Sequence, residues 1–280
     1  MALKRRQIRE DDVAAVAELL GRGFPGRSVA AWRDGLLRQA ARRVPEGQPR
    51  FGYCLDEDGR IVGAVLLLFS EPGGPGGGLR CNLSSWYVDP DFRVQAAPLL
   101  SFALKNAAVT YLNVSPAPNT WPTIEAQGFR HLRTGRRLAC PWLAGTGGDV
   151  RVHLFDPVRD AGLPEAALLA DHAALGCVCL VASGPGGAAG YAFAAIRLKG
   201  IVPVTQLVWC RDVAAFGKAA GPLGRALLRR GRPVLMIDGE APVPGCPSLP
   251  FLRDKRIYAR GPHPPGRGDV AYTEGVIFGS

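Results

Sequence analysis

Residues 81–98 read CNLSSWYVDPDFRVQAAP and predict a strand that runs directly into a helix. The first eight residues have strand character, Asp89-Pro90 ends the strand, and Pro98 suits the first turn of a helix extending to about Asn106. Such a junction points unpaired backbone N–H groups, and the positive end of the helix dipole, at the space in front of it. A pyrophosphate group fits there, so this stretch predicts an anion-binding site.

The elements around this stretch follow the order β-α-α-β-β-β-α-β-α-β. A turn at Asp56–Arg60 joins two apolar runs and is a strong hairpin signal. Gly128-Phe129 ends the last helix of this series and leads into its last strand. The other expected strands lie at 3–8, 51–55, 61–69, 81–88 and 109–114, and the helices at about 13–20, 29–42, 98–106 and 123–127.

A comparable series begins after a Gly-rich segment at 143–149. Trp86 and Val88 lie 122 residues before Val208 and Cys210, in strands that we expect to correspond. This spacing indicates an internal repeat, with a domain boundary in the Gly-rich segment. We therefore expect two domains, 1–142 and 149–280. The second has expected strands at 178–182, 190–196, 204–210 and 234–238, and a helix at 214–230.

The composition is that of a globular protein. The chain has 280 residues and a mass of 29.7 kDa, with 47% hydrophobic residues and a mean hydropathy of +0.06, which excludes disordered and fibrous classes. No apolar run reaches the roughly 18–20 residues that cross a bilayer, and the first residues are charged. We expect a cytoplasmic protein without membrane association.

The formal charge of +10 is divided evenly between residues 1–150 and 151–280. Its arginines are scattered rather than gathered on one element, so we expect no nucleic-acid partner, whereas a phosphorylated ligand fits the surplus. Five of the seven cysteines lie in apolar, strand-like contexts, which indicates buried apolar side chains. Cys177 and Cys179 have no matching pair or histidine, so we expect no metal site.

Four features of the first half occur in this order: Arg9-Glu10-Asp11-Asp12, Asp58-Gly59-Arg60-Ile61-Val62-Gly63, Val88-Asp89-Pro90-Asp91-Phe92-Arg93 and Glu125-Ala126-Gln127-Gly128-Phe129. As an ordered set they resemble the GCN5-related N-acetyltransferase superfamily. The resemblance implies an α/β (α+β) fold in which each of two similar domains has a mixed, mostly antiparallel sheet flanked by helices. In such a sheet, acyl-coenzyme A enters between two central strands that splay apart. The second half of the chain resembles the family less well than the first.

The resemblance also implies a set of residues that bind acetyl-coenzyme A or another acyl-coenzyme A. The backbone of Tyr87 and Val88 would pair with the pantetheine arm. The family's phosphate loop has two glycine or small positions, which Ala96 and Pro98 occupy here, and proline removes a backbone donor. The alternative is a simple strand-to-helix turn. The residues implied for the phosphates and the neighbouring site are Arg93, Val94, Gln95, Ala96, Ala97, Pro98, Leu99 and Asn119.

The sequence does not assign the catalytic residues. Ile124 occupies the place of the family's acid tyrosine, and no carboxylate lies between Asn82 and Val88, where the base usually lies. The polar candidates on this strand are Ser85 and Tyr87, with Ser84 beside them, although a tyrosine in a strand also commonly packs. Asp238, and Glu274 in an expected strand at 271–274, either reach a shared cleft or form caps and salt bridges. Gly217 and Gly221 permit either close helix packing or cofactor approach.

Two functions remain open from these observations. One is an acyltransferase that moves an acetyl or other acyl group from acyl-coenzyme A, held by the first half, to an amine of a small molecule or peptide. The other is a catalytically inactive binding or regulatory protein of the same fold, which the missing glycines, base and tyrosine favour.

Overall fold

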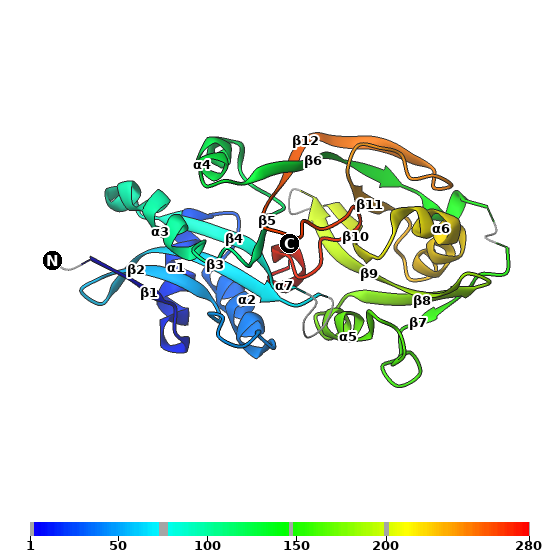
Figure 1. The fold of residues 1–280 in the computed structure, drawn as a ribbon, viewed down its shortest axis with the longest axis horizontal. Coiled ribbons are helices and arrows are strands. Elements are labelled where there is room, and N and C mark those ends of the chain that lie inside the picture. Colours follow the sequence, from blue (N-terminus) through cyan, green and yellow to red (C-terminus); the bar gives the residue numbers. More distant parts are fainter. Residues whose placement is uncertain (1–2, 73–77, 146–147, 199–201, 280) are drawn as a thin grey trace.

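The computed structural model describes residues 3–72, 78–145, 148–198 and 202–279. The strands form one 12-stranded sheet through the whole molecule, in the order β1-β2-β3-β4-β5-β12-β6-β11-β10-β9-β8-β7 (Figure 1). The strands of the first half are β1 (Leu3–Gln7), β2 (Gly52–Glu57), β3 (Arg60–Ser70), β4 (Arg80–Val88), β5 (Thr110–Asn113) and β6 (Arg130–Ala139). Those that follow are β7 (Arg151–Leu154), β8 (Val178–Gly184), β9 (Gly187–Leu198), β10 (Val202–Cys210), β11 (Leu235–Asp238) and β12 (Ser248–Arg260).

Helices cover both faces of this sheet. In the first half, α1 and α2 pack on one face, and α3 and α4 pack on the other. In the second half, α6 and α5 lie on opposite faces. The helices are α1 (Val13–Gly23), α2 (Val29–Ala41), α3 (Ala96–Ala103), α4 (Trp121–Ala126), α5 (Ala166–Ala174), α6 (Val213–Leu228) and α7 (Glu274–Ile277).

Two strand pairs, β4–β5 and β10–β11, are parallel, and all other neighbouring strands are antiparallel. The prediction of a mixed, mostly antiparallel sheet flanked by helices is therefore confirmed. The first-half element order is also as expected, because its signals are local. Val16, Leu19 and Leu20 are fully buried at helical spacing on α1. β3 is apolar from Ile61 to Phe69, because helices cover both of its faces.

The two halves exchange their last strands. β6 follows the first half in sequence but pairs with β11, while β12 pairs with β5 as well as with β6. Figure 1 shows β6 and β12 side by side along the top of the view, where they extend from the side of α4 to the side of α6. The expected domain boundary at 143–149 falls after β6, and residues 146–147 lie outside the described part of the chain. The sheet itself continues across both halves.

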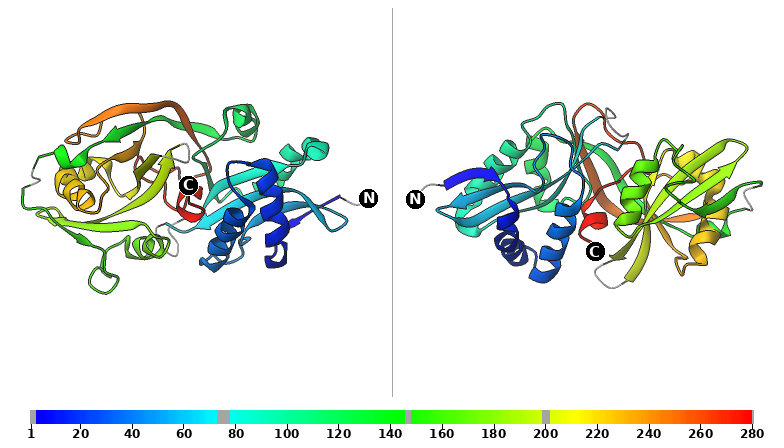
Figure 2. Two further views of the ribbon diagram at one scale, coloured as in Figure 1. Left: turned by 180° about the vertical axis from the view of Figure 1, so that it is seen from behind. Right: turned by 90° about the horizontal axis from the view of Figure 1, so that it is seen from below.

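The chain ends in the middle of the molecule. After β12 it returns between the halves and forms the short helix α7 (Figure 2). The expected strand at 271–274 is wrong. Tyr272 has a φ of 56°, which breaks extended backbone, and Glu274 is the first residue of α7.

Candidate functional site

Each half contains a pair of parallel strands that separate. β4 pairs with β5 at Arg80–Asn82 and then continues to Val88 with β3 as its one remaining partner among the described strands. Ser84 and Ser85 form a bulge opposite Leu66 of β3, and this bulge bends β4 away. In the second half, β10 pairs with β11 at two positions and continues to its own end, with a bulge at a similar place. The sheet therefore has two V-shaped openings.

The backbone of Trp86 and Val88 faces the first opening. Asp89 N–H donates to Val62 O at 2.8 Å, so the residues at 89 and 87 bond to β3. Hydrogen-bonded and non-bonded positions alternate in an antiparallel pair, so the backbone groups of Trp86 and Val88 point the other way. No described residue bonds to these groups. The free edge of β4 thus offers a hydrogen-bonding ladder to an extended ligand.

The chain's own C-terminal segment fills the second opening. Cys210 N–H donates to Gly268 O at 2.9 Å, and Val270 N–H donates to Val208 O at 2.9 Å. Val208 and Cys210 lie at the end of β10, as Trp86 and Val88 lie at the end of β4, and they stand 122 residues after those two residues. Within the described chain, the backbone edge at the end of β4 is therefore free, whereas the edge at the end of β10 is paired with the C-terminal segment.

Past the end of β4, the chain forms the 3-10 helix η2 (Pro90–Gln95), which runs into α3. Ala96 N–H donates to Arg93 O inside this helical run, and Pro98 has no N–H. Side chains supply positive charge instead. Arg93 is exposed and has no ion pair with a described residue, and Arg5 Nη2 donates to Gln95 Oε1 at 2.6 Å. An anion bound at the start of α3 would therefore contact the guanidinium groups of arginine side chains rather than backbone N–H groups.

The corresponding helix start in the second half is closed to anions. Asp212 caps α6, and its carboxylate accepts hydrogen bonds from Ala214 N–H and Ala215 N–H, both at 3.0 Å. The glycines of α6 serve packing, because a Cβ on Gly217 would overlap with Pro244 O and one on Gly221 with Gly145 O. The second half thus lacks both a free strand edge and a free helix terminus.

A polar cluster lies at the bulge of β4, on the face that carries α1 and α2. Ser84 Oγ donates to Glu274 Oε2 at 3.1 Å, and Ser85 also bonds to this carboxylate. Arg27 Nη1 lies 3.8 Å from Glu274 Oε1. Burial raises the pKa of Glu274, although 29% of its side chain stays exposed, and Arg27 opposes the rise. A carboxylate therefore stands beside the part of β4 where the sequence has none.

The predicted site residues fall into three groups. Ser85, which is 6% exposed, belongs to the cluster around Glu274. The ring of Tyr87 packs against Gly23 and lies 6.2 Å from the ring of Phe24, so its side chain contributes to packing. Asn119 is exposed in η3 (Pro118–Thr120), and no hydrogen bond joins it to the other candidates among the described residues. The residues implied for the phosphates lie around the start of α3: Arg93, Val94, Gln95, Ala96, Ala97, Pro98 and Leu99.

Asp238 does not share the cluster with Glu274. Its side chain is 2% exposed and pairs with Arg136 Nε at 2.9 Å. Sequence reasoning missed Arg27 altogether, because a lone arginine in a turn carries no signal. The sequence leaves two roles open for Glu274, reaching a shared cleft or forming a cap or salt bridge, and only the folded chain identifies β4 as its neighbour.

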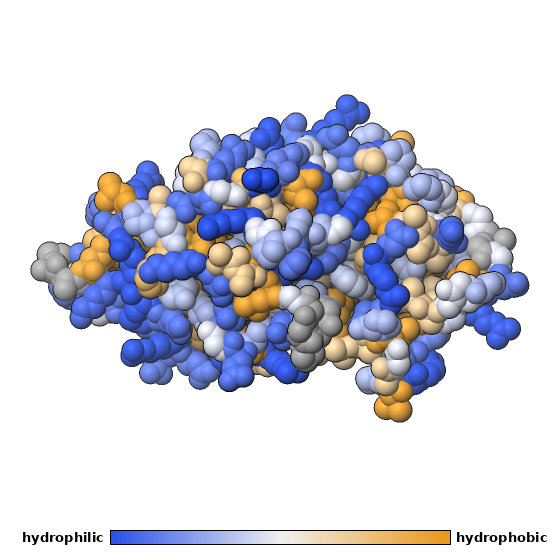
Figure 3. Space-filling view, viewed as in Figure 1, coloured by the Kyte–Doolittle hydropathy of each residue, from blue (hydrophilic) through white to orange (hydrophobic). Residues whose placement is uncertain are grey.

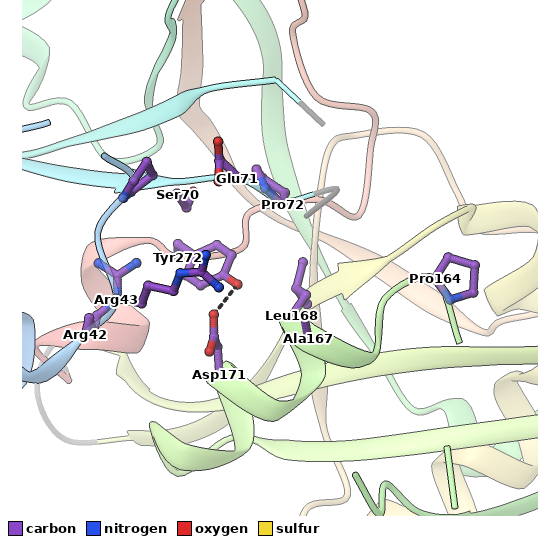
Figure 4. A pocket seen from close by; sticks show the side chains of 11 residues that line it. Arg42, Arg43, Ser70, Glu71, Pro72, Pro164, Ala167, Leu168, Asp171 and Tyr272 are labelled. Atoms are coloured by element: carbon purple, nitrogen blue, oxygen red, sulfur yellow. Dashed lines mark hydrogen bonds between the residues drawn. The ribbon is translucent and has the colours of Figure 1, made fainter. Parts of the chain in front are cut away.

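A recess of about 80 Å³ lies between the halves, near the start of the C-terminal helix (Figure 4). Tyr272 O–H donates to Asp171 Oδ2 at 2.7 Å, and the guanidinium of Arg42 stacks over the tyrosine ring at 5.2 Å. Tyr272 N–H donates to Nε2 of His172, whose burial lowers its pKa to about 4. These contacts fix the residue that stands two positions before Glu274.

The surface in Figure 3 is mostly hydrophilic, with apolar residues in separate patches. Within the described ranges, no group of three or more metal-binding side chains is present. No helix in the described part of the chain has the length and hydropathy that crossing a bilayer requires. Five of the seven cysteines are buried, as expected, and all seven are free.

Comparison with family models found no match, and comparison with curated proteins found none either. Among solved structures, the chain is similar to a GCN5-related N-acetyltransferase from Kribbella flavida, with a TM-score of 0.58 and 14% identity over 92% of this chain and 72% of that one. A putative acetyltransferase from Pyrococcus horikoshii matches with a TM-score of 0.55 and 11% identity, over 96% and 93% of the two chains.

A third similar structure contains the GCN5-related glucosamine N-acetyltransferase region of a fungal multi-domain GH3 β-N-acetylglucosaminidase. Its TM-score is 0.54 at 13% identity, over 92% of this chain, and this chain spans 38% of that protein. The chain has the fold of the GCN5-related N-acetyltransferases.

Proposed function

We propose that the protein is an acyl-coenzyme A-dependent N-acyltransferase whose first half binds the thioester. The second half is, in this proposal, a degenerate copy that binds none, and the location is cytoplasmic. The acceptor is an amine of a small molecule or a peptide.

The difference between the two openings carries this proposal. An extended pantetheine arm needs a strand edge with free N–H and C=O groups, and Trp86 and Val88 supply such an edge. The corresponding edge of β10 is used by the chain itself at Gly268 and Val270. If neither opening bound a ligand, we would expect no difference between the two strand edges. A free edge in the first half and a paired edge in the second are expected if only the first opening binds a thioester.

Positive charge beyond the end of β4 supports the same assignment. Arg93 and Arg5 flank the start of α3, and Arg60 stacks over the ring of Phe92 at 5.8 Å. Guanidinium groups form strong charge-assisted bonds with phosphate oxygens. They compensate for Ala96 and Pro98, which replace the glycine and small residue that the resemblance led us to expect.

The test is release of free thiol from acetyl-coenzyme A and longer acyl-coenzyme A thioesters with a panel of amines: glucosamine, an aminoacyl amide and a lysine peptide. Losing one charge-assisted phosphate contact costs about 1.5–3 kcal/mol, so Arg93→Ala is expected to raise KM for the thioester by about tenfold or more. The matched control is Arg253→Ala, at an exposed arginine of β12.

Thiol release that depends on the amine, together with an unchanged melting temperature in Arg93→Ala, is the expected result. Thioester binding without turnover for any amine would instead favour a binding or regulatory protein. Failure to bind any thioester would rule out the acyltransferase and would favour a binding or regulatory protein whose ligand is not a thioester.

A further inference from the structure

We infer that Glu274, carried by the C-terminal helix, is the general base that deprotonates the acceptor amine at the bulge of β4. This inference rests on the function proposed above and deepens it. The residue lies after all twelve strands in sequence, yet it serves the opening of the first half.

The order of groups along β4 places Glu274 beside the reacting carbonyl. The phosphate end of a thioester lies near Arg93, and its arm follows the free edge from Val88 to Trp86. Continuing in the same direction, the arm's thioester end reaches the bulge at Ser84 and Ser85. Glu274 accepts a hydrogen bond from Ser84 Oγ at 3.1 Å. The carboxylate therefore stands where an attacking amine must approach.

The carboxylate is held in place by first-half side chains. Arg38 Nε donates to Ile277 O and its Nη2 donates to Phe278 O, both at 2.9 Å. Phe278 packs 5.7 Å from the ring of Trp32. Upstream of the helix, Asn82 Nδ2 donates to Ala271 O at 3.1 Å. Contacts on both sides of α7 fix the position of its first residue relative to β4.

The electrostatic environment suits a proton acceptor. Burial raises the pKa of Glu274 toward the working pH, which strengthens a carboxylate as a base. The 29% exposed fraction of its side chain leaves room for an amine or a bridging water. Asp238, the other carboxylate considered for a shared cleft, is 2% exposed and paired with Arg136. Glu274 is thus the better placed of the two.

The reaction balances as follows. The ammonium of the acceptor gives one proton to Glu274, and the nitrogen lone pair then forms the N–C bond to the thioester carbonyl carbon. The C–S bond breaks and its electron pair leaves with the coenzyme A sulfur, which takes the second proton lost from the nitrogen. Glu274 returns its proton to solvent, so the products are an amide, free thiol and one proton.

The test compares Glu274→Gln with the wild-type chain, using acetyl-coenzyme A with the amine panel and with water alone as acceptor. General-base catalysis contributes about 10²–10⁴-fold, so kcat is expected to fall at least about 100-fold while calorimetric affinity for acetyl-coenzyme A stays unchanged. The wild-type rate should rise with pH through the pKa of Glu274, because only the ionised carboxylate accepts a proton. Glu274→Gln should lose this rise, and Glu274→Asp should recover part of the rate.

Two controls separate chemistry from folding and from binding. Glu18→Gln, at an exposed position of α1, should leave the rate and its pH profile unchanged, and the melting temperature of Glu274→Gln should stay near that of the wild type. If Glu274→Gln keeps the wild-type rate and pH profile, the inference is wrong and the proposed function stands. A wild-type chain that binds acetyl-coenzyme A but transfers to neither amine nor water would also overturn the inference. A chain that binds none would overturn the proposed function with it.

Discussion

Three glycines of α6 allow the chain's own backbone to approach this helix closely. Gly221 faces the carbonyl oxygen of Gly145, and Gly224 faces the backbone of Trp142 in the turn after β6. The sequence left packing and cofactor approach open for Gly217 and Gly221. Their neighbours are segments of the chain itself, so packing is the explanation, and no local pattern identified which segments those are.

Gly221→Ala tests this explanation. The new Cβ would overlap with Gly145 O, and overpacking of this kind costs about 1–3 kcal/mol. Helix propensity alone predicts the opposite, a gain of about 1 kcal/mol. Urea denaturation should therefore show a less stable variant. Lys218→Ala, at an exposed position of the same helix, is the control and should change stability by no more than about 0.5 kcal/mol. A stabilised Gly221→Ala would contradict the packing.

At the scale of elements, the segment between β12 and α7 connects the two openings. It pairs with β10 through Gly268 and Val270, and between these two pairings Asp269 binds Arg80 of β4. Both Arg80–Asp269 hydrogen bonds are short, at 2.7 and 2.6 Å, and the side chains are 11% and 10% exposed. One segment therefore closes the second opening and brings Glu274 to the first.

Arg80→Met should show how strongly this ion pair fixes the segment. Removing one partner of a buried pair leaves an uncompensated charge and costs about 3–5 kcal/mol. The double variant Arg80→Met/Asp269→Asn should recover a substantial part of that loss, because no unpaired charge remains. The measurement is a double-mutant cycle in urea. A single variant as stable as the wild type would mean that the segment is held by its other contacts.

Elements with local signals could be predicted from the sequence, and elements defined by distant pairing could not. The strand and helix at residues 81–106 follow from alternation, proline placement and helical spacing. The exchange of β6 and β12 leaves no such signal, since the partners of β12 lie more than a hundred residues away. Asp269 and Arg80 are 189 positions apart. For the same reason Glu274 was expected in a strand rather than at the start of α7.

At the scale of the whole molecule, the two halves share one sheet and differ in their openings. Both halves contain a parallel strand pair that separates and a bulge in the longer strand of that pair. Only in the second half does the C-terminal segment take the strand edge and Asp212 take the helix terminus. The first half keeps its edge free, and the end of the chain supplies the carboxylate that its own strand lacks.

The most direct test of this account is calorimetric titration of the protein with acetyl-coenzyme A, repeated on two matched variants. Ala96→Glu places a carboxylate at the start of α3, and Ala215→Glu places one in the first turn of α6, where Asp212 already caps the helix. The account predicts one site per chain of micromolar order, abolished by Ala96→Glu and unchanged in Ala215→Glu. Two sites per chain, or binding lost in Ala215→Glu and kept in Ala96→Glu, would contradict it.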